Sequence, residues 1–399
     1  MRTAMNALSK LKVAGQVAVI GAHVCWERVV RSNYQTLSQI PPSTDALTCE
    51  WLTAALFPSH PESAVTSLRL GDRSDGSTSR QVLFLEYNQA GQDSGLPERM
   101  FCKSSPNFTS RLITGLSGAL QSEAGFYTTL RNQVEMQTPH AYYCAVDPKS
   151  ARSIFLMEDI AFTRGARFGD PTTLRVTHEM AESIVANLAA YHGRFWENPV
   201  LGTLPWLQTS LGFQNRVNAT IDFEKRTLVG IGRSEHLAPQ DFLRRRTEVF
   251  PATMRSLELN LRGPRTLLHS DMHVGNWYTC GDATMGVYDW QCATTGEWAL
   301  DVAYALMSAL TVDDRRAWER DLIALYLDEL ARAGGEPPTF DQALLRYRQQ
   351  AFHALIFWLY TIGSGRMQPH MQHRHVAEAN VARMTQAVVD LESLDSLGS

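Results

Sequence analysis

Four polar residues in the later part of the chain have types and spacing that suit phosphoryl transfer. His269, Asp271 and Asn276 form the pattern H-x-D-x-x-x-x-N, and Asp289 follows thirteen positions later at the end of an apolar run. Phosphoryl transfer needs an aligned nucleophile and positive charge on the phosphate oxygens. Asp271 is the candidate base that orients an acceptor hydroxyl, and Asn276 with Asp289 supplies the oxygen ligands that Mg²⁺ prefers. We expect His269 to brace this loop by hydrogen bonds rather than to act as the base.

A lysine and a glutamate earlier in the chain complement this loop. Lys103 ends the strand-like run Phe101–Lys103, and Glu123 lies twenty residues later in an expected helix. A strand lysine held by a helix glutamate presents an ammonium group to nucleotide phosphates. Taken singly, each is better explained as a solvated surface charge. Their order relative to the catalytic loop favours the functional interpretation.

A turn rich in small residues lies ahead of Lys103. Residues 71–79 read GDRSDGSTS, which is not a G-x-G-x-x-G loop. Small residues let backbone N–H groups approach a phosphate, and the hydroxyls of Ser77, Thr78 and Ser79 add donors. An ordinary hairpin turn is the alternative interpretation.

The elements that must position these residues change character along the chain. Runs rich in β-formers at 65–70, 81–87, 99–103, 141–146 and 153–157 predict a small antiparallel sheet, with helices at 47–56 and 116–131. A helix at 172–196 and further helices over 300–394 follow, with two short strands within 264–289. The fold class is α+β. We expect an N-terminal extension over 1–40, a nucleotide-binding region over 41–160 and a helical region over 161–399.

Composition excludes several function classes. The 399 residues carry a net charge of −4, so no general basic field attracts nucleic acid. The six cysteines are scattered without zinc spacing, which favours free thiols in a reducing cytoplasm. No run is long and apolar enough for a transmembrane helix. The apolar run Val13–Cys25 contains Gln16 and His23, so it predicts an amphipathic extension rather than a signal peptide.

These motifs together resemble the aminoglycoside phosphotransferase/choline kinase-like superfamily, and within it the ecdysteroid-kinase-like branch. That branch typically has an HGDLHxGN-like loop and a DWQ-like strand end; this chain has HSDMHVGN at 269–276 and DWQ at 289–291. Further similar blocks occur in the family's order over residues 45–375: LPERMFCK at 96–103, SEAGFY at 122–127, FLMEDI at 155–160 and LAAYHGRFW at 188–196.

The resemblance implies a bilobal, protein-kinase-like fold with ATP and Mg²⁺ as cofactors. It implies that Lys103 binds the α- and β-phosphates, and that a hinge after Met157 offers adenine the backbone carbonyl of Glu158 and the backbone N–H of Ile160. One departure is Ser270, which stands where the family mostly has glycine. We interpret it as tolerable.

The acceptor is the least determined part of the prediction. No segment between Asp289 and the next helix is long enough for a protein-kinase activation segment, so a small-molecule hydroxyl is favoured over a protein. The aromatic run 351–362 favours a hydrophobic alcohol, although these side chains serve equally well as core. The alternatives are an aminoglycoside or macrolide kinase, a catalytically silent nucleotide-binding scaffold, and an adenylyl transferase. The oligomeric state is left open.

Overall fold

The computed structural model describes residues 7–30, 33–76, 78–219, 221–281, 283–365 and 372–398. The chain divides into two units. Unit 1 comprises residues 1–132 and 139–165, and unit 2 comprises residues 133–138 and 166–399. The region expected as an N-terminal extension contains helix α1 (Ala7–Val29), which belongs to unit 1.

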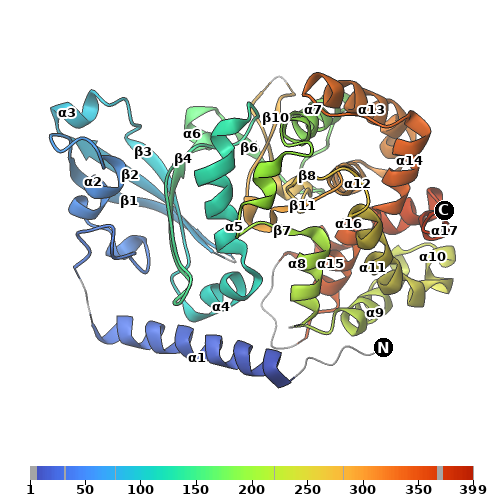
Figure 1. Cartoon of the computed structure of the whole chain (residues 1–399), viewed down its shortest axis with the longest axis horizontal. Helices are drawn as coiled ribbons and strands as arrows, with labels where there is room; N and C mark the ends of the chain where they lie inside the picture. Colours follow the sequence, from blue (N-terminus) through green and yellow to red (C-terminus); the bar gives the residue numbers. More distant parts are fainter. Residues whose placement is uncertain are drawn as a thin grey trace. The chain divides into compact units, whose positions relative to one another are not determined.

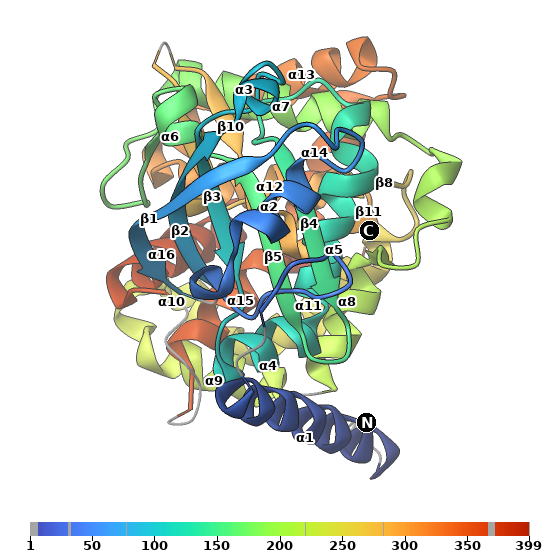
Figure 2. The ribbon, with the colours of Figure 1, turned by 90° about the vertical axis from the view of Figure 1, so that its left-hand side faces the viewer.

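Unit 1 is built on an antiparallel sheet with the strand order β1-β2-β3-β5-β4 (Figure 2). Its strands are β1 (Val65–Asp75), β2 (Ser79–Tyr87), β3 (Arg99–Ser104), β4 (Ala141–Asp147) and β5 (Arg152–Glu158). Alternate residues of β2 face inward, as a half-buried strand requires. The predicted strands are therefore present, and β1 extends further than the sequence pattern indicated.

Helix α2 (Cys49–Leu56) covers the apolar face of this sheet (Figure 2). Thr48 caps it by accepting a hydrogen bond from the backbone N–H of Trp51 at 3.1 Å. Trp51 and Leu52 are fully buried against Leu83 and other sheet residues. This core includes Met100 and Cys102 of β3, the strand that carries Lys103.

The segment predicted as one helix over 116–131 is divided into shorter pieces: the end of one helix, a second short helix, a π-helical turn over Phe126–Leu130 and the start of a 3-10 turn over Arg131–Gln133. Helix α4 (Phe108–Ser117) ends and helix α5 (Ala119–Gly125) begins at Gly118, whose φ of +79° lies in the left-handed region. Glycine adopts this conformation without a Cβ clash, so the chain changes direction there. The break places Glu123 on its own short helix.

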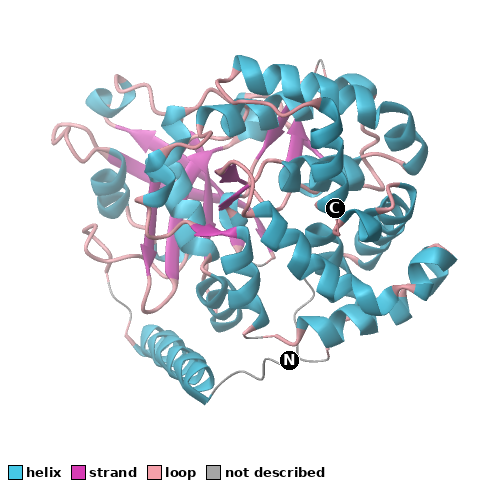
Figure 3. Ribbon diagram, turned by 45° about the vertical axis from the view of Figure 1, so that its right-hand side comes forward, coloured by secondary structure: helices cyan, strands magenta, loops and turns pink. Residues whose placement is uncertain are grey.

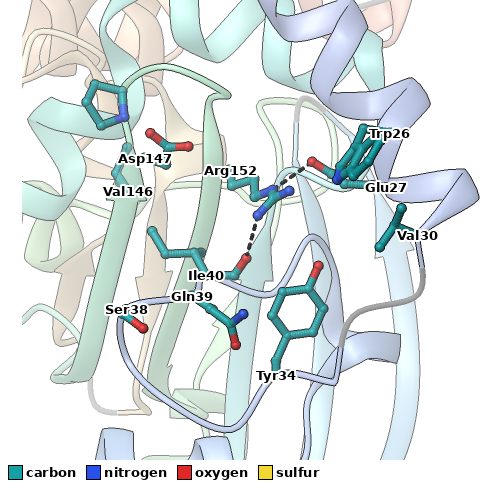
Figure 4. Close-up of a pocket in the computed structure, with 11 residues that line it drawn as sticks. Trp26, Glu27, Val30, Tyr34, Ser38, Gln39, Ile40, Val146, Asp147 and Arg152 are labelled. Atoms are coloured by element: carbon teal, nitrogen blue, oxygen red, sulfur yellow. Dashed lines mark hydrogen bonds and ion pairs between the residues drawn. The ribbon is translucent and has the colours of Figure 1, made fainter.

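Helix α1 is anchored to unit 1 by buried charges near its C-terminal end. Glu27 forms two hydrogen bonds to the guanidinium of Arg111 on α4, both 2.7 Å, and one to Arg152 on β5 at 2.6 Å. Figure 4 shows the Glu27–Arg152 pair in the wall of a pocket of about 480 Å³ between α1, the following loop and the β4–β5 turn. The Arg152 guanidinium also donates to the carbonyl of Ile40.

Unit 2 is mainly helical (Figures 1 and 3). Its helices are α7 (His178–Arg194), α8 (Ser210–Asn218), α9 (Phe223–Arg233), α10 (Gln240–Arg244), α11 (Val249–Asn260), α12 (Ala299–Ala309), α13 (Val312–Arg332), α14 (Phe340–Gln349), α15 (Phe352–Ile362), α16 (Arg374–Asp390) and α17 (Ser393–Ser396). Short helices α3 (Gln89–Gln92) and α6 (Ile160–Thr163) belong to unit 1.

Two small sheets of unit 2 frame the predicted catalytic loop. One has the order β7-β11-β8 and the other β10-β9-β6. The strands are β6 (Arg167–Phe168), β7 (Gln208–Thr209), β8 (Thr266–Leu268), β9 (Trp277–Thr279), β10 (Met285–Val287) and β11 (Thr294–Gly296). The loop leaves β8 and returns into β9. The predicted α+β class, with a smaller sheet unit and a larger helical unit, is confirmed.

Helix α7 begins six residues later than predicted, because Thr177 caps it by accepting from the backbone N–H of Met180. Among the described residues, no helix combines the length and the apolar character needed to cross a membrane. The cytoplasmic location stays a prediction.

Candidate active site

The carboxylate of Asp271 is held by hydrogen bonds to both of its oxygens. The hydroxyl of Tyr304 donates to Oδ1 at 2.9 Å, and the amide nitrogen of Asn276 donates to Oδ2 at 3.0 Å. The same nitrogen also donates to the backbone carbonyl of Asp271 at 2.8 Å. The Asp271 side chain is 23% exposed, so the carboxylate is oriented yet accessible. Each oxygen keeps a lone pair for an incoming hydroxyl.

His269 braces the loop, in line with the role expected from the sequence. Its Nδ1 accepts the backbone N–H of Asp271 at 3.3 Å, and its Nε2 lies 3.0 Å from the carbonyl of Tyr288. These partners assign a neutral ring with the proton on Nε2. Burial lowers the pKa of His269 despite the nearby carboxylates, which keeps it neutral. With both nitrogens engaged, the ring has no lone pair left for a base.

Asp301 on α12 anchors the backbone of the loop. Its carboxylate accepts the N–H of His269 at 2.7 Å and the N–H of Ser270 at 2.8 Å. Tyr191 on α7 donates to it at 2.6 Å. Burial alone would raise the pKa of Asp301, but hydrogen bonds from His192 and Tyr191 outweigh it and hold that pKa low. Asp301 is therefore an ionised, fully buried anchor.

Ser270 adopts a backbone conformation that favours glycine. Its φ is +65°, in the left-handed region, where a Cβ is disfavoured. The substitution for the family's glycine thus carries backbone strain, which refines the expectation that it is tolerable. Hydrogen bonds compensate in part, because the Ser270 hydroxyl pairs with that of Thr294 at 2.7 Å and its carbonyl with Nε2 of His353 at 3.2 Å.

Asn276 and Asp289 lie at neighbouring positions of unit 2. The backbone N–H of Tyr288 donates to the carbonyl of Asn276 at 3.0 Å, and Asp289 follows directly, with a φ of +68°. The two bonds from the Asn276 amide nitrogen to Asp271 fix the amide and direct its oxygen elsewhere. An amide oxygen and a buried carboxylate are a donor set that fits Mg²⁺, which usually takes few protein ligands beside phosphates and water.

The structure pairs Lys103 with Glu123 inside unit 1. Lys103 Nζ lies 2.9 and 2.7 Å from the two carboxylate oxygens, and the residues are 4% and 2% exposed. Neither is therefore the solvated surface charge that the alternative interpretation required. A buried ion pair of this kind is retained for placement of the ammonium more readily than for stability.

Two of the three predicted turn hydroxyls lie within the described residues. Thr78 and Ser79 are buried, and neither hydroxyl has a hydrogen-bond partner in the described part of the chain. Buried hydroxyls normally find partners, so these two suit a ligand. Ser77 lies outside the described residues.

The expected adenine contacts map to the end of β5 and the start of α6. Met157 and Glu158 end β5, and Ile160 begins α6. The Glu158 side chain pairs with Arg164 at 2.6 Å, so it serves local structure. The assignment of these backbone groups to adenine stays a prediction.

Tyr304 was not predicted as a site residue. It follows Asp301 by three positions on α12, which places both on one helix face toward the loop. That spacing was the available signal. Burial and the Asp271 charge raise the pKa of Tyr304 far above its usual range, so it stays a hydrogen-bond donor.

Replacing Tyr304 with phenylalanine is expected to lower kcat by about tenfold, because Asp271 loses one of two orienting bonds. The KM for ATP should stay unchanged. Tyr347→Phe is the matched control, since its hydroxyl lies 3.3 Å from the Glu319 carboxylate and is not bonded to the loop. A shared loss of kcat in both variants would contradict the positioning role.

Comparison with known proteins identifies the family. The model of the phosphotransferase enzyme family matches residues 108–339, more than half of the chain. The chain therefore belongs to this family and is a phosphotransferase, and the resemblance to the superfamily is confirmed. The ecdysteroid-kinase-like branch stays a prediction. A comparison with curated protein sequences found no match.

Solved structures with similar chains include three enzymes. A microcompartment-associated aminopropanol kinase has 16% identity and a TM-score of 0.49, and the match covers 83% of this chain and 93% of that one. A putative aminoglycoside phosphotransferase from Ralstonia eutropha has 14% identity and a TM-score of 0.47, and the match covers 82% of this chain and 93% of that one. A choline kinase from Streptococcus pneumoniae has 14% identity and a TM-score of 0.42, and the match covers 86% of this chain and 98% of that one.

Proposed function

We propose that this protein transfers the γ-phosphoryl group of ATP, with Mg²⁺, to a hydroxyl group of a small molecule. The observation that carries this proposal is the Asp271 carboxylate, fixed by Tyr304 and Asn276 and still accessible. Such a carboxylate can accept a hydrogen bond from an alcohol and orient its oxygen for in-line attack.

In the proposed reaction the acceptor O–H lies against Asp271. The acceptor oxygen forms a bond to the γ-phosphorus while the bond from that phosphorus to the β–γ bridging oxygen breaks. The hydroxyl proton passes to Asp271, and ADP leaves with the bridging oxygen. Asp301 and His269 hold the loop backbone, so little reorganisation is needed as the proton moves.

The residues that we assign to the nucleotide phosphates lie in unit 1. Lys103, fixed by Glu123, donates to the α- and β-phosphates, and the hydroxyls of Thr78 and Ser79 add contacts to the phosphate chain. Asn276 and Asp289 would hold Mg²⁺, which when bound would offset the charge of the phosphates.

Lys103→Met is expected to lower kcat/KM for ATP by about a hundredfold, because a preorganised positive charge is lost. It also leaves Glu123 buried without its partner, which destabilises the fold. The double variant Lys103→Met/Glu123→Leu should regain stability and stay inactive. Recovery of activity in the double variant would show that the pair serves stability alone.

We propose a hydrophobic alcohol as the acceptor, on the strength of an aromatic cluster continuous with the loop. His353 pairs with Ser270 and packs on Phe357, whose ring contacts Phe223; Tyr360 stacks on Phe223 with centroids 4.5 Å apart. Helix α15 carries no acidic residue that would pair with a polycationic antibiotic. The fully buried Trp277 and Trp298, by contrast, serve the core.

An ATP-consumption screen tests this function. The panel comprises sterols, other lipid-like alcohols, choline, sugars, aminoglycosides and macrolides. We expect Mg²⁺-dependent consumption with a hydrophobic alcohol and none with buffer alone. Consumption with an aminoglycoside or macrolide would replace the acceptor assignment. Mg-ATP binding without consumption by any member would favour the silent scaffold.

A further inference from the structure

Helix α1 exposes a continuous apolar face that the function above does not use. Seven exposed positions follow the i, i+3, i+4, i+7 pattern of one helix face: Gly15, Ala18, Val19, Ala22, Cys25, Trp26 and Val29. None of the seven is charged or bears a hydroxyl or amide side chain. The largest are well exposed, with Val19 at 44%, Trp26 at 63% and Val29 at 79%. Large apolar side chains gathered on one surface indicate an interaction site.

Within the described side chains of α1, the opposite face packs against the rest of unit 1. Ile20 and Val24 are buried, and the Gln16 amide donates to the carbonyl of Gly115 on α4. Figures 1 and 2 show α1 at the edge of unit 1 beside α4. The Glu27 ion pairs lock this orientation. The apolar stripe therefore cannot turn inward without breaking buried charge pairs.

The charges of α1 favour an anionic partner. The helix contains Lys10, Lys12 and Arg28, and its one acid is Glu27. The Glu27 carboxylate is occupied by Arg111 and Arg152. Along its sequence α1 therefore has an excess of basic residues, of which Arg28 is exposed beside the apolar surface, and its one acid is already paired. That combination suits the interface of an anionic lipid bilayer, where tryptophan is also favoured.

We propose that α1 lies flat on anionic lipid surfaces, with its Val19–Trp26–Val29 side inserted among the headgroups, and docks unit 1 there. A second copy of this chain is a poorer partner, because two α1 helices would bring basic residues together without an acid to pair them. The inference stands on α1 alone and does not depend on the acceptor.

Cosedimentation of the full-length protein with vesicles tests this proposal. The vesicles are pure phosphatidylcholine, or phosphatidylcholine with about 30% phosphatidylglycerol to supply negative charge. We expect binding to the anionic vesicles only, weakened when NaCl rises from about 0.1 to about 0.5 M, because salt screens the attraction. Val19→Glu/Trp26→Glu should lower the partition coefficient at least about tenfold.

Leu261→Glu is the matched control, since Leu261 is 42% exposed on unit 2, and this variant should bind like the wild type. If the double variant is destabilised, the single substitution Ala22→Glu, at an exposed helical position, replaces it. Absence of binding to anionic vesicles would overturn the proposal. So would a dimer in solution that Ala22→Glu dissociates while vesicle binding is unaffected. ATP consumption is measured in parallel, so that a failure of vesicle binding can be distinguished from a failure of the proposed phosphotransferase activity.

Discussion

Replacing Asp271 with asparagine should lower kcat by about 10²- to 10⁴-fold, the range for loss of a positioned general base. Asparagine keeps the size of the side chain but presents an NH₂ group to one of the donors, Tyr304 or Asn276. It also cannot take the acceptor proton. Affinity for ATP should change little, since Asp271 is assigned to the acceptor. Steady-state rates and nucleotide titration measure the two effects separately.

The control for this variant is Asp313→Asn, because Asp313 has a side chain that is 96% exposed and undergoes the same chemical change. It should retain wild-type kcat. A kcat within a factor of about three of wild type for Asp271→Asn would mean that another group activates the acceptor.

Replacing Glu27 with glutamine should cost about 3–5 kcal/mol of unfolding free energy. The variant leaves the guanidinium of Arg111, which is fully buried, without its charge partner. Arg152 loses the same partner. Urea unfolding measures the difference. Asp45→Asn is the control, because the Asp45–Arg73 pair is largely exposed and should contribute less than about 1 kcal/mol.

The Glu27 contribution should also depend on pH. Burial alone would raise the pKa of Glu27, but the hydrogen bonds and charges of Arg111 and Arg152 outweigh it and lower that pKa. A carboxyl with a lowered pKa in the folded state stabilises the protein above its unfolded pKa. The stabilisation is lost as pH falls from the usual value of 4.5 through the folded value. Glu27→Gln should flatten this acid limb; an unchanged acid limb would contradict the assignment.

The sequence predicted this site best where chemistry depends on side chains at fixed spacing. The H-x-D-x-x-x-x-N pattern singled out Asp271 and Asn276, and Lys103 was singled out as the end of a short strand-like run. The Lys103–Glu123 pair was predicted because a strand lysine held by a helix glutamate is the arrangement that presents an ammonium group to nucleotide phosphates in kinases. Tyr304 was missed because a tyrosine inside an apolar helix is more often core than a partner of a carboxylate.

Backbone conformation was the other feature that the sequence did not predict. The turn at Gly118 and the positive φ of Ser270 depend on the packing of distant elements, which local pattern does not report. The anchoring of α1 was equally hidden, because Glu27 finds Arg111 and Arg152 across 84 and 125 positions of sequence. Pairs so far apart leave no periodic signal in a single sequence.

The most direct test of the central claim is the mass of the product formed from ATP, Mg²⁺ and an acceptor that stimulates ATP consumption. We expect the acceptor to gain one phosphoryl group, with ADP as the second product, and Asp271→Asn to form neither. An acceptor that gains AMP, with release of pyrophosphate, would contradict the account and identify an adenylyl transferase.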